Sequence, residues 1–140
     1  MNVAIDQTGI QNVSNLFRCQ LRELEQPKDD TSDCHGFNRI AEAINSTLVT
    51  LWYLIAGATV DPASDLERCS ELWRQYRDLI TTGIDSLSSA KIAHPGCALS
   101  GVYDKALDLL NSTNERIRMT DRMIACRRNP HLDQLFPKTS

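Results

Sequence analysis

The sequence predicts an all-α fold, a single-domain antiparallel four-helix bundle whose helices have uneven lengths. Apolar residues recur at spacings of three and four through most of the 140-residue chain, and almost nowhere at a spacing of two. Groups of Pro, Gly and polar residues divide the chain into four such segments. Because the connections are of moderate length, we expect consecutive helices to pack antiparallel.

The composition agrees with one soluble globular domain. Hydrophobic residues make up 41% and charged residues 24% of the chain, which is enough to bury one core. We expect a single helical domain over residues 1–140, with residues 1–9 as a flexible N-terminus and residues 130–140 as a C-terminal tail. The formal net charge is -3, whereas nucleic-acid-binding domains usually carry a concentrated basic surface. We therefore expect no nucleic-acid partner.

The first helix is predicted over residues 10–26, with Thr8 as a cap and Pro27 at its end. Its apolar stripe consists of Ile10, Val13, Phe17, Leu21 and Leu24. A polar loop follows, and the second helix is predicted over residues 37–58. The inward stripe of the second helix consists of Phe37, Ile40, Ile44, Leu48, Leu51 and Ile55.

The third helix is predicted over residues 62–90. Asp61 suits a helix cap and Pro62 suits the first turn, but Ser64 and Glu67 also match a capping box. Both start positions therefore remain open. The apolar face consists of Leu66, Cys69, Trp73, Tyr76, Ile80, Ile84 and Leu87.

The fourth helix is predicted over residues 100–129, after a break at residues 94–96 and before Pro130. Its inward residues are Val102, Ala106, Leu109, Leu110, Ile117 and Ile124, and its C-terminal half also holds a cluster of arginines, Arg116, Arg118, Arg122, Arg127 and Arg128. Cations near a helix C-terminus are favoured by the helix dipole. Arg118 and Arg122 point away from the core on a helical wheel, so they form either a solvated face or a basic contact surface for an acidic partner.

The second helix carries more apolar surface than one stripe of a bundle requires. Over residues 48–60 the apolar side chains lie around the whole circumference, and a helix of this kind is normally buried. Either a second protein molecule or the tail residues Leu132, Leu135 and Phe136 must cover its outer side. We predict a surface for a dimer or another partner, formed by Val49, Trp52, Tyr53 and Ile55.

The five cysteines follow the expected topology, because the first and third connections of such a bundle lie at the same end. Cys34 and Cys97 would then meet as one disulfide, and Cys69 and Cys126 would form a second pair near the opposite end. Unrelated reduced thiols are the other interpretation, which the odd count favours. With His35 and His94, the first pair also makes a zinc ligand set. Adjacent Cys-His is awkward for joint ligation of one ion, so we expect no metal.

The sequence contains no catalytic constellation. Its three His residues all lie outside the predicted helices, and neither a nucleophile elbow nor a Glu-x-x-His motif occurs. The six Gly residues are scattered and form no phosphate-binding loop. We therefore expect neither enzymatic activity nor a cofactor.

Residues 83–87, Gly-Ile-Asp-Ser-Leu, resemble the phosphopantetheine attachment motif of acyl and peptidyl carrier proteins. Those proteins are small acidic helical domains, and their modified serine lies at the start of a helix. The resemblance implies a prosthetic arm on Ser86. The alternative is that Ile84 and Leu87 are core positions within the third helix.

Together these patterns predict a non-enzymatic module for protein–protein interaction, such as an adaptor, a chaperone or an inhibitor (antiactivator), and a homodimer. The alternatives are the carrier-like domain and a secreted helical effector stapled by disulfides. Residues 1–11 show no signal peptide, and the most apolar window, residues 48–60, is shorter than the about 20 residues of a membrane span. We expect a cytoplasmic protein that does not bind membranes, with export by a signal-independent route left open.

Overall fold

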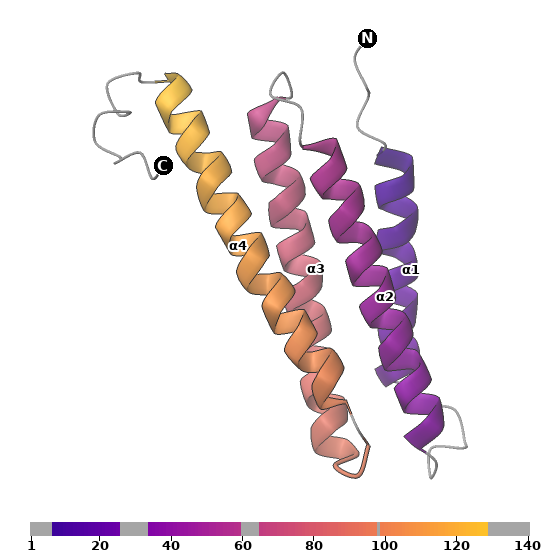
Figure 1. Cartoon of the computed structure of the whole chain (residues 1–140). Coiled ribbons are helices and arrows are strands. Elements are labelled where there is room, and N and C mark those ends of the chain that lie inside the picture. Colours follow the sequence, from indigo (N-terminus) through magenta and orange to yellow (C-terminus); the bar gives the residue numbers. More distant parts are fainter. Residues whose placement is uncertain (1–6, 26–33, 60–64, 98, 129–140) are drawn as a thin grey trace.

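The computed structural model describes residues 7–25, 34–59, 65–97 and 99–128. These residues form an antiparallel four-helix bundle of α1 (Gln7–Glu25), α2 (Cys34–Ala58), α3 (Leu66–Ala93) and α4 (Ser100–Arg128), with no strand in the described part (Figure 1). The predicted fold class is therefore confirmed. The predicted tail at 130–140 and most of the N-terminal segment at 1–9 lie outside the described residues.

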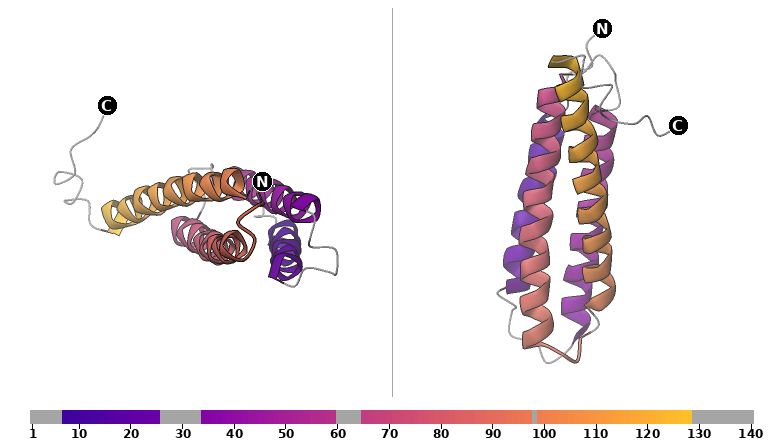
Figure 2. Two further views of the ribbon diagram at one scale, coloured as in Figure 1. Left: turned by 90° about the horizontal axis from the view of Figure 1, so that it is seen from below. Right: turned by 90° about the vertical axis from the view of Figure 1, so that its left-hand side faces the viewer.

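The helices are arranged in two layers. Figure 2 shows α2 and α4 in one layer and α1 and α3 in the other. Each consecutive pair packs together, α1 and α3 also contact each other, and α2 contacts both α3 and α4. Among the described residues α1 and α4 do not contact each other, because they lie at opposite corners.

The third helix begins later than either predicted start. Its N-cap is Asp65, whose carboxylate accepts hydrogen bonds from the backbone N–H groups of Glu67 at 3.0 Å and Arg68 at 3.3 Å. These bonds satisfy donors that have no partner inside the helix, so Asp65 fixes the first turn. The second helix begins earlier than predicted, at Cys34, which therefore belongs to the helix and not to the loop before it.

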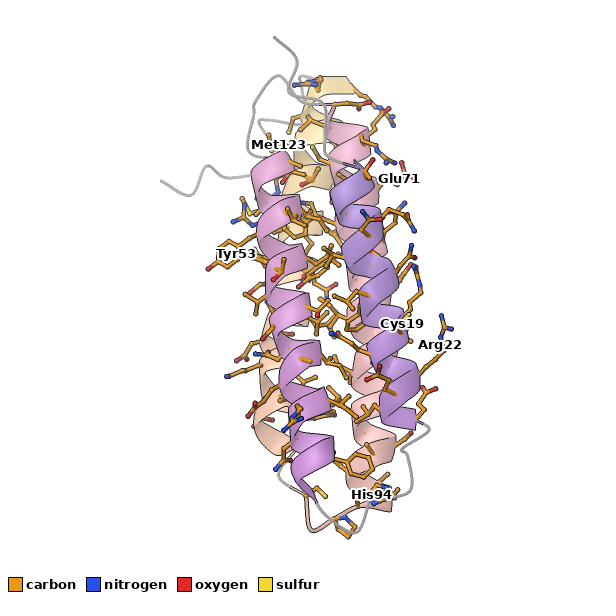
Figure 3. All side chains as sticks on the ribbon, turned by 90° about the vertical axis from the view of Figure 1, so that its right-hand side faces the viewer. Cys19, Arg22, Tyr53, Glu71, His94 and Met123 are labelled. Carbon is orange, nitrogen blue, oxygen red and sulfur yellow. The ribbon has the colours of Figure 1, made fainter. Side chains whose placement is uncertain are left out.

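One hydrophobic core fills the space between the helices, as the side chains in Figure 3 show. Its largest fully buried side chains are Trp73, Tyr76, Phe17, Phe37, Ile44, Leu48, Leu51, Ile55, Leu72, Ile80, Leu87 and Leu99. The Tyr76 hydroxyl donates a hydrogen bond of 2.6 Å to the backbone carbonyl of Leu48, which joins α3 to α2 inside the core. This bond satisfies a polar group that would be costly to bury alone.

Gly83 allows α1 to approach α3 closely. A Cβ atom at this position would lie 2.8 Å from Cζ of Phe17, whose ring is fully buried. Real Cβ atoms essentially never come this close to another heavy atom. The glycine of the Gly-Ile-Asp-Ser-Leu segment therefore has a packing role between two helices.

Polar contacts fasten α4 to α3 near the C-terminal end of α4. The Ser70 hydroxyl donates to Asp121 at 2.8 Å, and Arg74 donates to the Ser70 hydroxyl at 3.2 Å and forms an ion pair with Asp121. A further ion pair joins Glu67 to Arg128. These contacts hold α4 against α3, whereas α4 diverges from α2 toward Arg128 (Figure 1).

Candidate functional site

The outer side of α2 has an exposed aromatic residue on an uncharged surface. Residues 43–58 contain no charged side chain. Tyr53 is 70% exposed, and Val49 and Trp52 are half-buried. Three of the four residues predicted for a partner surface therefore reach the surface of the bundle.

Ile55 was predicted for the same surface, and that prediction is wrong. Its side chain is only 2% exposed, because it lies on the inward stripe with Leu48 and Leu51. Spacings of three and four place all three residues on one side of the helix. Ile55 therefore belongs to the core and cannot contact a partner.

Trp52 links the outer side of α2 to the core and to α4. Its ring centroid lies 4.8 Å from that of Trp73 and 6.1 Å from that of Tyr76. The Arg116 guanidinium lies over both tryptophan rings, 5.8 Å from the Trp52 centroid and 5.9 Å from the Trp73 centroid. These contacts account for the half-buried state of Trp52. The tail residues Leu132, Leu135 and Phe136 lie outside the described residues.

Helix α4 adds two methionines that the sequence analysis did not identify. Met119 and Met123 are half-exposed, and Met123 projects from the same side of the molecule as Tyr53 (Figure 3). Together with Arg116 they follow one stripe of α4 at spacings of three and four. We call the combined surface the α2–α4 face; it comprises Val49, Trp52, Tyr53 and Ala56 of α2 with Arg116, Met119 and Met123 of α4.

A shallow hollow lies at the edge of this face. Its volume is about 430 Å³, and it is lined by Trp52, Asn111, Ser112, Glu115 and Arg116. The hollow combines one aromatic ring with hydrogen-bonding groups and both signs of charge. Such a combination can orient a partner side chain, but it contains no nucleophile paired with a base.

The predicted basic contact surface lies outside the face. Arg118 is exposed and forms an ion pair with Glu115 on the preceding turn of α4. The hydrogen bond from Arg118 lowers the pKa of Glu115, with smaller electrostatic contributions from Arg118 and Arg122. Arg122 is exposed as well. Both arginines therefore lie on the solvated side of α4, near a carboxylate of the same helix.

The cysteines are in different states. Cys97 is disulfide-bonded, whereas Cys19, Cys69 and Cys126 are free. The predicted pairing of Cys69 with Cys126 is therefore wrong: Cys69 is buried on the apolar stripe of α3. Burial raises the pKa of its thiol, and the nearby charge of Asp65 adds to the increase. The side chain of Cys34, the remaining cysteine, lies outside the described part.

Of the four candidate zinc ligands, the side chains of His94 and Cys97 lie in the described part of the chain. The His94 ring packs against Phe37 with a centroid distance of 4.2 Å, which places the third connection beside the start of α2. Cys97 is in a disulfide, and zinc binds a thiolate, not a disulfide sulfur. The described residues contain no group of three potential ligands, and the His35 side chain lies outside them.

Ser86 does not lie at the start of a helix, so this expectation from the carrier-protein resemblance is wrong. It lies well inside α3 and is 6% exposed. Its hydroxyl donates a hydrogen bond of 2.7 Å to the Glu25 carboxylate at the end of α1. In this position the hydroxyl joins two helices and is not presented to a modifying enzyme.

A cleft of about 480 Å³ lies between α1 and α3. Its floor contains Leu51, Leu72 and Tyr76, and its rim contains Arg18 and Asp78. Burial raises the pKa of the Tyr76 hydroxyl, and that hydroxyl already donates to Leu48 in the core. A neutral, internally bonded phenol is not available for proton transfer, so Tyr76 contributes only apolar contact to the floor of the cleft.

Residues Gly36–Ala58 of α2 are long and apolar enough to span a membrane by length and composition, which no other helix in the described ranges is. Buried core helices pass the same test, and 33% of the most apolar window is buried here.

Comparisons of the chain with protein-family models, with curated proteins and with solved structures found no match.

Proposed function

We propose that this protein has no catalytic activity and binds another protein through the α2–α4 face, as an adaptor, chaperone or inhibitor does. The observation that carries the proposal is the exposure of Tyr53, Met119 and Met123 on two adjacent helices. Apolar residues scattered singly over a surface need no explanation, but a continuous group on neighbouring elements is typical of an interaction site.

The residue types on the face support the same conclusion. Trp, Tyr and Arg provide most of the binding energy at protein interfaces, and Met is enriched there because its flexible side chain adapts to a partner. The face contains Trp52, Tyr53 and Arg116 close together, since Arg116 lies over the Trp52 ring. A partner that covers this group would bury the exposed apolar atoms without any change in the bundle core.

The proposal is tested by affinity capture and sedimentation of three proteins: wild type, the double variant Tyr53→Ser/Met123→Ser, and the control Ile92→Ser. Ile92 is 80% exposed near the end of α3 and lies outside the face. All three substitutions remove exposed apolar side chains, so all proteins should fold. Capture from the source organism identifies a partner, and sedimentation velocity tests for a homodimer.

We expect the double variant to lose the partner or the dimer, while Ile92→Ser retains it. A double variant that captures the same proteins in the same amounts as wild type, with an unchanged sedimentation coefficient, refutes the proposal. Loss of binding in the control as well would show that exposed apolar residues act non-specifically, which also contradicts a defined face.

The bonded state of Cys97 favours a second candidate, a secreted helical domain that a disulfide staples. Disulfides persist in oxidising compartments and are rare in the cytosol. Protein isolated from its source without reductant and then denatured should therefore show three reactive thiols, from Cys19, Cys69 and Cys126. Five reactive thiols would exclude this candidate and favour the cytoplasmic location.

A further inference from the structure

The α2–α4 face is apolar in the middle and continues into a basic end. Arg116, Met119, Met123 and Arg127 follow each other along α4 at spacings of three, four and four, so they lie on one stripe of the helix. Arg116 and Arg127 are both exposed. One arginine therefore lies at each end of the methionine pair.

Neither of these arginines forms an ion pair within the described residues, and the carboxylates of Asp65 and Glu67 share a hollow with Arg127 at its end of the stripe. The two acidic residues among residues 109–128, Glu115 and Asp121, form ion pairs with arginines outside the stripe. The facing part of α2, residues 43–58, has no charged residue. The stripe therefore presents two arginines that form no ion pair within the described part of the bundle.

This charge pattern disfavours a second copy of the chain as the occupant. A two-fold dimer brings the same surface of both subunits together, so arginines of one stripe would face arginines of the other. Like charges in an interface oppose association and discriminate against the wrong partner. An occupant with carboxylates is favoured instead.

The secondary structure of the occupant follows from the fold. The described residues form helices only, so they offer no strand edge on which an extended segment could pair its backbone. Recognition must use side chains, as when an amphipathic helix lies in a groove between helices. Helix α4 leans away from α2 toward its C-terminal end (Figure 1), and Met119 and Met123 in this half of the helix are half-exposed.

We propose that the α2–α4 face binds an acidic amphipathic helix, an inference that rests on the proposed function and names the chemistry of the partner. The distance along α4 from Arg116 to Arg127 is about 16 Å at 1.5 Å per residue. The partner helix therefore has about three turns, with apolar residues against Met119 and Met123 and a carboxylate near each end. Trp52 would lie beneath this helix, so binding of the helix should change the tryptophan emission of the protein.

The test uses two synthetic helical peptides that share one leucine stripe and contain no tryptophan. One peptide has glutamates on both sides of the stripe and the other has lysines. Binding is measured from the tryptophan emission of the protein, at low and at high salt. The proteins are wild type, Arg116→Gln, Arg127→Gln and the control Arg118→Gln, which alters an arginine outside the stripe.

We expect the acidic peptide to bind wild type about ten-fold more tightly than the basic peptide, since two partly exposed ion pairs provide about this factor. Each stripe variant should lose part of that preference, high salt should reduce it, and Arg118→Gln should retain it. Measurement of Arg127→Gln guards against a change in emission that Arg116→Gln alone would cause through the tryptophan contact.

Equal affinity for the two peptides, or no binding of either, overturns the acidic-helix proposal. If Tyr53→Ser/Met123→Ser still loses its captured partner in that case, the proposed function stands and only the partner chemistry is wrong. Binding to vesicles of phosphatidylserine that Arg116→Gln and Arg127→Gln abolish, without a peptide preference, would assign the stripe to a membrane surface. A salt-resistant dimer that Tyr53→Ser/Met123→Ser dissociates would assign it to a second copy.

Discussion

Replacement of Gly83 by alanine tests the close approach of α1 to α3. Alanine is favoured over glycine inside a helix by about 1 kcal/mol. The new Cβ atom, however, would lie 2.8 Å from Cζ of the buried Phe17 ring, and overpacking of this kind costs about 1–3 kcal/mol. We expect a net loss of about 1 kcal/mol in the free energy of unfolding, and a fall in Tm of about 4 °C.

Urea denaturation followed by far-UV circular dichroism measures this change. Gly57→Ala is the matched control, because an added Cβ there has no neighbour within 4 Å, and it should stabilise the protein by up to about 1 kcal/mol. In a Phe17→Leu background the contacting ring atom is absent, so Gly83→Ala should become stabilising. If Gly83→Ala stabilises the wild-type chain as much as Gly57→Ala does, the close approach imposes no constraint and the reasoning fails.

Two further predictions concern the core and the disulfide. Tyr76→Phe removes the hydrogen bond to Leu48 and should cost about 1 kcal/mol of unfolding free energy. Burial raises the pKa of Tyr76 above its ordinary value of 10, so the phenol ionises in the unfolded chain before it ionises in the folded protein. The stability present below pH 10 is therefore lost as the pH rises further. Denaturation midpoints plotted against pH should fall less steeply for Tyr76→Phe than for wild type, and equal slopes would contradict this. Reduction of the Cys97 disulfide should lower the unfolding free energy by about 2–4 kcal/mol, measured by denaturation with and without reductant. The control Cys19→Ser should leave the unfolding free energy unchanged, because Cys19 is a free, exposed thiol. A denaturation midpoint that does not respond to reductant would refute the cross-link.

The sequence was sufficient to predict the four helices because each has a long, regular apolar stripe. The start of α3 was harder to place, since residues 61–67 contain several competent caps. Asp61, Ser64 and Asp65 all suit an N-cap by residue type. The choice of Asp65 depends on where α3 first meets the core, which is at its first buried residue, Leu66. The sequence alone does not show this position.

The candidate surface was predicted in part. The uncharged segment 43–58 of α2 indicated an apolar outer side, and Tyr53 is its most exposed large side chain. Ile55 was assigned both to the inward stripe and to the partner surface, and its spacing of four from Leu51 and seven from Leu48 places it on the inward stripe. Met119 and Met123 of α4 were not predicted for the surface, because in the sequence an apolar residue within a helix reads as an ordinary core position. Their spacing relative to Arg116 and Arg127 was the available signal.

The way α4 is attached explains how one surface of a small bundle can remain open to a partner. The polar contacts of α4 with α3, Ser70 and Arg74 with Asp121 and Glu67 with Arg128, lie on the side of the helix away from the methionines. Because those contacts and the buried core hold α4 in place, its stripe toward α2 need not be covered for the fold to persist. If the face binds a partner as proposed, binding does not require the bundle to unfold, and substitutions on the stripe should change binding while leaving the denaturation midpoint nearly constant.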